Sequence, residues 1–138
     1  MDFTDPRQVG LVLARARAVN GLVMLLVPGL AARVIFGSAG SSPVARTLLR
    51  LVGVRDLVLG VGAITTLKEG TMDAEWVGMG AVADGVDALV CLLTPGLPMR
   101  ARATVFVGGS AAVQGLLVSR ALADGRRPVV EDASELDA

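Results

Sequence analysis

Two charged residues, Arg55 and Asp56, are adjacent at the centre of the apolar stretch GVRDLVLG, residues 53–60. A second apolar stretch carries Asp84 and Asp87 three residues apart, a spacing that places both carboxylates on one face of a helix. Carboxylates can move protons, and a guanidinium can stabilise developing negative charge. If the protein is an enzyme, the residue types therefore predict carboxylate acid–base chemistry, such as an isomerisation or cyclisation, with Asp84, Asp87 and Asp56 as the candidate catalytic residues.

Further polar residues lie at a similar depth when consecutive helices are taken to alternate in direction. Arg17 and Asn20 fall in the same layer from the first apolar segment, and Ser110 and Gln114 from the last. Arg15 faces nearly opposite Arg17 and is the weakest member of the layer. The candidate substrate-binding residues are Arg17, Asn20, Arg55, Arg50 and Gln114.

The residue types that the chain lacks exclude several kinds of site. The sequence has no histidine, no tyrosine and a single cysteine, Cys91. An internal disulfide, a Cys/His zinc site, a histidine-ligated haem and a Ser-His-Asp triad are therefore excluded. We expect neither a metal nor a cofactor. Thirteen basic residues balance thirteen acidic ones, so the charge does not indicate a nucleic-acid partner.

The elements that position these residues are apolar segments of membrane-spanning length. The chain is 53% hydrophobic, with a mean hydropathy of +0.64. Four segments, each close to the ~20 residues that cross a bilayer, run over about 8–27, 48–67, 75–94 and 102–122. The stretch LAARVIF at 30–36 predicts a short interfacial helix. The sequence thus predicts an all-α, four-transmembrane-helix antiparallel bundle in the cell membrane over residues 1–122, followed by a polar, flexible tail at 123–138.

A soluble four-helix bundle is the alternative, and it requires a polar stripe on each helix. Residues 103–119, ATVFVGGSAAVQGLLVS, contain no charged residue, and no water-facing stripe can be drawn on any of the four segments. The pattern favours the membrane bundle.

Three motifs resemble a family of small four-helix membrane proteins that is commonest in actinobacteria and loosely DoxX-like. They are MLLVPGL in the first segment, RLVGVRDLVLG at 50–60 and DGVDALV at 84–90. The resemblance covers about residues 10–120. It implies four membrane helices, with Arg50, Arg55, Asp56, Asp84 and Asp87 as signature positions, and it carries no established activity.

The central prediction is a mid-bilayer Arg/Asp pocket for a lipophilic small molecule or lipid with a polar head. Intramembrane ionisable residues point to a functional site by default. The alternative is an accessory subunit in which the same charges fix helix register, its partner being a second copy or another membrane protein. A proton or ion path ranks lowest, because the sequence shows one polar layer and no ladder of acids beside it.

Overall fold

A computed structural model describes residues 5–125 of the chain, apart from the side chain of residue 105. All regular structure in this range is helical, as predicted. In chain order the elements are α1 (Pro6–Leu26), α2 (Pro28–Phe36), the 3-10 helix η1 (Gly37–Ser41), α3 (Pro43–Glu69), α4 (Asp73–Leu93) and α5 (Met99–Gly125). Residues 123–125 belong to α5, and the rest of the predicted tail lies outside the described residues.

Local capping chemistry sets the helix boundaries. The Asp5 carboxylate accepts a hydrogen bond from the backbone nitrogen of Arg7 at 2.9 Å, and Pro6 occupies the first turn of α1. Ser42 caps α3 in the same way, directly before Pro43. A polar cap followed by proline is a strong helix start. It explains why α3 begins well before residue 48, where the apolar pattern alone placed its start.

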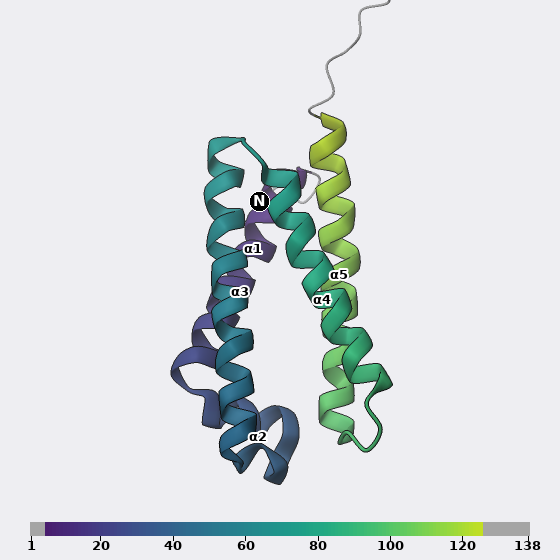
Figure 1. The fold of residues 1–138 in the computed structure, drawn as a ribbon. Helices are drawn as coiled ribbons and strands as arrows, with labels where there is room; N and C mark the ends of the chain where they lie inside the picture. Colours follow the sequence, from purple (N-terminus) through teal and green to yellow (C-terminus); the bar gives the residue numbers. More distant parts are fainter. Residues whose placement is uncertain (1–4, 126–138) are drawn as a thin grey trace, which may run out of the picture.

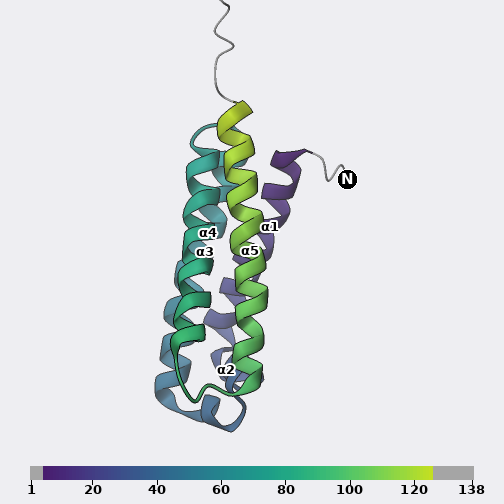
Figure 2. The ribbon, with the colours of Figure 1, turned by 90° about the vertical axis from the view of Figure 1, so that its right-hand side faces the viewer.

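The long helices form two antiparallel pairs. α1 packs chiefly against α3, and α4 packs chiefly against α5 (Figures 1 and 2). The chain runs down α1, up α3, down α4 and up α5, while α2 lies across one end. Contact between the two pairs is less extensive than contact within them.

Glycines bring the backbones of α1 and α3 together. A methyl group on Gly21 would lie 2.5 Å from the backbone nitrogen of Leu57 and 2.6 Å from the carbonyl oxygen of Gly53. A methyl group on Gly60 would lie 2.6 Å from the backbone nitrogen of Ala18. Small residues of this kind allow close helix approach in membrane proteins. Gly53 and Gly60 therefore form the face of α3 that contacts α1.

The end of the molecule opposite α2 is the better packed. An apolar cluster there joins four helices through Ala14, Ala63, Leu67, Ala74, Val77, Val118 and Leu122. Arg7 forms an ion pair with buried Asp73 at 3.4 Å, and the Ser119 hydroxyl donates to the carbonyl of Ala74 at 2.7 Å. The apolar cluster and the Arg7–Asp73 ion pair hold the two helix pairs together at that end, while the Ser119 hydrogen bond joins α5 to α4 within one pair.

Three helices, α1, α4 and α5, are long and apolar enough to cross a membrane. α3 is of similar length, but Arg50, Arg55 and Asp56 in its middle keep it out of this set. Large apolar side chains are exposed on all four long helices, among them Leu22, Val58, Val86 and Leu117. Such an apolar surface suits lipid rather than water. The structure is thus consistent with a membrane protein, since three of the four predicted segments are helices long and apolar enough to cross a membrane.

Candidate functional site

Arg17 links three helices through its guanidinium. Nη1 donates to Asp56 Oδ1 on α3 at 3.4 Å, and Nη2 donates to the carbonyl oxygen of Gly80 on α4 at 3.0 Å. Nη2 also donates to Asp84 Oδ2, one turn further along α4. The side chain of Arg17 is only 15% exposed, so these partners replace water around a charged group.

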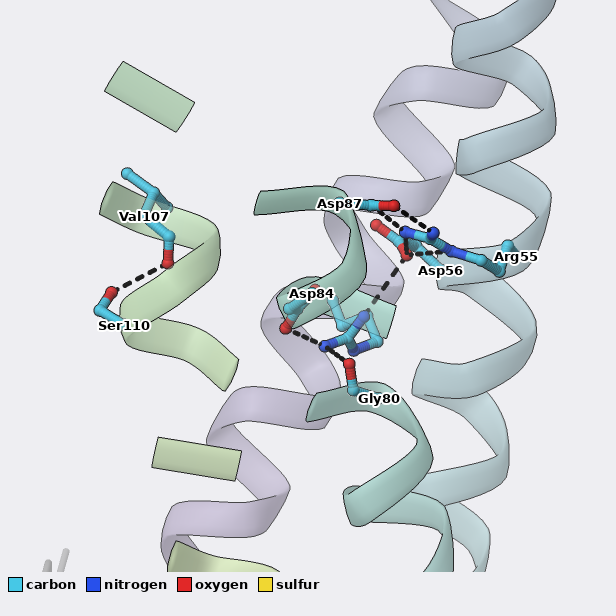
Figure 3. Close-up of polar contacts among 8 residues, drawn as sticks. Arg55, Asp56, Gly80, Asp84, Asp87, Val107 and Ser110 are labelled. Atoms are coloured by element: carbon cyan, nitrogen blue, oxygen red, sulfur yellow. Dashed lines mark hydrogen bonds and ion pairs between the residues drawn. The ribbon is translucent and has the colours of Figure 1, made fainter. Parts of the chain in front are cut away.

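Arg55 makes the second set of contacts. It holds Asp87 in a two-point ion pair, with Nη1 to Oδ1 at 2.8 Å and Nη2 to Oδ2 at 2.6 Å. Its Nε and Nη2 also donate to Asp56 Oδ1, at 3.2 and 2.9 Å. Asp56 Oδ1 therefore accepts from both arginines and connects the two ion pairs into one network (Figure 3). The five side chains Arg17, Arg55, Asp56, Asp84 and Asp87 are called the Arg/Asp cluster below.

Gly80 makes room for the Arg17 guanidinium. A methyl group at Gly80 would lie 3.1 Å from Nε, 3.2 Å from Cζ and 3.2 Å from Nη2 of Arg17. That is closer than side chains normally pack, so an alanine would push the guanidinium away from α4. Gly80, Asp84 and Asp87 share one helical stripe in the sequence, and this spacing was the signal for the surface that receives Arg17.

A cavity of about 1140 Å³ lies beside the Arg/Asp cluster, with walls from all five α-helices. Most of the lining is apolar, including Met24, Val34 and Leu48. The charged and amide side chains in the lining are Arg17, Asn20, Asp56, Asp84 and Asp87. The cavity thus combines a long apolar wall with one polar region, which is the usual composition of a small-molecule site.

The structure brings together most of the predicted site residues but not all. Asp56, Asp84, Asp87, Arg17 and Arg55 form the Arg/Asp cluster, and Asn20 lines the cavity beside it.

Arg50 and Gln114 are exposed and outside the cavity lining, and Arg15 is also exposed. Ser110 is turned toward its own helix, where its hydroxyl donates to the Val107 carbonyl at 2.9 Å (Figure 3). The expectation that α5 supplies polar residues to the layer is therefore wrong for Ser110 and Gln114. Depth along a helix says nothing about rotation around its axis, and α5 presents small residues to α4 instead, such as Gly115 against Ala81.

Two further residues line the cavity. The ring of Trp76 packs over Gly62 on α3 and contributes to the cavity wall. Cys91 also lines the cavity and is half-buried. No sequence signal separates a cavity wall from ordinary packing, because both use the same apolar residue types.

No family model, curated protein or solved structure matches this chain. The site is therefore interpreted from its own geometry.

Proposed function

We propose that the chain is a four-span integral membrane protein whose cavity binds a lipophilic small molecule or lipid, with the polar head at the Arg/Asp cluster. One observation carries the proposal: the cavity of about 1140 Å³, apolar along most of its wall and charged in one region. Ligand pockets commonly measure ~300–1,000 Å³, so the space is sufficient for an amphiphile with a long apolar chain.

The fourth span in this proposal is α3. Its central charges, Arg55 and Asp56, have partners on neighbouring helices, because Arg55 pairs with Asp87 and Asp56 pairs with Arg17. An unpaired charge at the bilayer centre costs about 2.5–3.5 kcal/mol on insertion scales. Pairing across the bundle lowers that cost, which supports placing α3 in the membrane beside α1 and α4.

The contacts of the carboxylates support binding more directly than catalysis. Both oxygens of Asp87 already accept from Arg55, and Asp84 is paired with Arg17. If the protein is also an acid–base isomerase or cyclase, the proton is carried by Asp84 or Asp56. Each of these has one oxygen that accepts no hydrogen bond within residues 5–125.

The alternative role, an accessory membrane subunit, is favoured by a different observation. Every charged side chain of the Arg/Asp cluster is in an ion pair, as expected where charges only fix helix register. In that case the apolar helix faces bind a second copy of the chain or another membrane protein.

Native mass spectrometry of protein purified in a mild detergent, with identification of extracted lipids, tests the proposal. We expect a stoichiometric amphiphile that is lost or weakened in Asp84→Asn and retained in the control variant Gln114→Ala, whose side chain lies outside the cavity lining. An empty wild-type protein, together with an Asp84→Asn variant that fails to assemble, would support the accessory subunit instead.

A further inference from the structure

We infer that the ligand of this cavity is a lipophilic amine, whose protonated nitrogen binds the carboxylates of the Arg/Asp cluster. The inference rests on the proposed binding function and specifies the charge of the head group. It follows from the balance of charges around the cavity, the unused hydrogen-bonding capacity of the cluster and the composition of the wall.

The first observation is an excess of negative charge. The Arg/Asp cluster has three carboxylates and two guanidiniums, which leaves one carboxylate in excess. All three carboxylates line the cavity, whereas only Arg17 of the two arginines does so. Arg15 and Arg50, the nearest other arginines in the sequence, are exposed and outside the lining. A molecule in the cavity therefore meets more negative than positive charge.

The second observation is that two carboxylate oxygens of the cluster remain open as acceptors. Within residues 5–125, Asp56 Oδ2 and Asp84 Oδ1 accept no hydrogen bond. Both carboxylates border the cavity, so these oxygens can accept from a bound molecule. An ammonium group supplies up to three donors.

The third observation separates an amine from a metal ion. No group of three or more His, Cys, Asp or Glu side chains within the described residues can hold a metal. An ammonium nitrogen needs no such ligand set, and its alkyl chain accounts for the apolar wall. A lipophilic amine therefore matches both parts of the cavity.

The single cysteine of the chain provides the test. Cys91 lines the cavity, so a bound amphiphile should slow its reaction with a neutral methanethiosulfonate reagent. The protein, in maltoside micelles, is titrated with dodecylammonium, dodecanol and dodecanoate, which share one chain length and differ in head charge. A Cys91→Ser/Thr71→Cys variant, with its thiol in the exposed loop before α4, corrects for effects on the reagent or the micelle.

We expect half-protection of Cys91 at a concentration of dodecylammonium about tenfold lower than that of dodecanol, with dodecanoate weakest. Equal protection by all three, or preference for dodecanoate, would overturn the inference and leave the binding function standing. If none of the three compounds protects Cys91, both this inference and the proposed binding function are wrong.

A second variant tests the sign of the charge without breaking an ion pair. Asn20 lines the cavity and makes no side-chain hydrogen bond within residues 5–125. Asn20→Asp should strengthen protection by dodecylammonium several-fold and weaken protection by dodecanoate. The same amide-to-acid change in Gln114→Glu should leave both unchanged. Equal effects of the two variants would show a general charge effect and contradict a cation site in the cavity.

Discussion

The most direct test of the Arg/Asp cluster is to replace Arg17 with methionine, which keeps an unbranched side chain and removes the charge. Among residues 5–125, Asp84 then loses its one ion-pair partner, and Asp56 keeps only Arg55. The Asp84 side chain is 15% exposed, so water replaces little of the lost contact. Removing one partner of a buried ion pair costs about 3–5 kcal/mol. We expect Arg17→Met to lower the free energy of unfolding by that amount.

The cost should depend on the charge left behind on Asp84. Adding Asp84→Asn to Arg17→Met removes that orphaned carboxylate, so the double variant should regain stability. Coupling energies between residues in contact are about 0.5–3 kcal/mol, and a recovery of at least about 1 kcal/mol is expected. Asp87→Asn is the matched control, because Asp87 lies one turn further along α4 and pairs with Arg55 rather than Arg17.

Reversible unfolding in mixed micelles, followed by circular dichroism as the fraction of denaturing detergent rises, measures these differences. Two results would refute the reasoning. In the first, Arg17→Met is as stable as the wild type. In the second, Asp87→Asn restores stability as well as Asp84→Asn does, which would mean that total charge matters and the pairing geometry does not.

Three further substitutions test separate parts of the structure by the same unfolding measurement. Gly21→Ala places a methyl group against the backbone of α3 and should lower the free energy of unfolding by about 1–3 kcal/mol. Gly109→Ala, with open space around it, should lower it by less than about 0.5 kcal/mol. Equal losses in the two variants would contradict the helix contact. Gly80→Ala should shift the guanidinium by a few tenths of an ångström and weaken the coupling of Arg17 to Asp84. Unchanged coupling would show that the guanidinium does not lie against Gly80. Arg50→Gln should change the free energy of unfolding by less than about 0.5 kcal/mol and leave ligand retention intact, since Arg50 is exposed. Loss of the ligand in this variant would show that Arg50 belongs to the binding site.

Much of the helical framework could be predicted from the sequence, because apolar segments bounded by turn residues are a strong local signal. Predicted segments at 8–27 and 75–94 correspond closely to α1 (Pro6–Leu26) and α4 (Asp73–Leu93). The sequence pattern did not predict the extension of α3 back to Pro43, because Arg46 and Thr47 interrupt the apolar run and the start depends on the Ser42 cap. Apolar periodicity carries no information about a cap.

The cluster could be predicted in part because depth along alternating helices is readable from residue counts. That reasoning brought Arg17, Asp56 and Asp84 to one layer, and the structure joins them through the guanidinium. Rotation of a helix around its axis is set by packing, and α5 packs on α4 through a stripe of small residues that includes Gly108, Ala112 and Gly115. Ser110 and Gln114 therefore had the expected depth and the wrong direction.

The charges that distinguish α3 from the other long helices also explain how it would enter a membrane in the proposed arrangement. By itself α3 carries too much charge to qualify as a span, and its excess comes from residues that include Arg55 and Asp56. Within α3, Arg55 and Asp56 pair with each other, and further partners come from α1, through Arg17, and from α4, through Asp87. The glycine contact between α1 and α3 brings Arg17 close to Asp56. The insertion of α3 would thus be favoured by α1, so the Arg/Asp cluster would serve assembly of the bundle as well as the binding of a ligand.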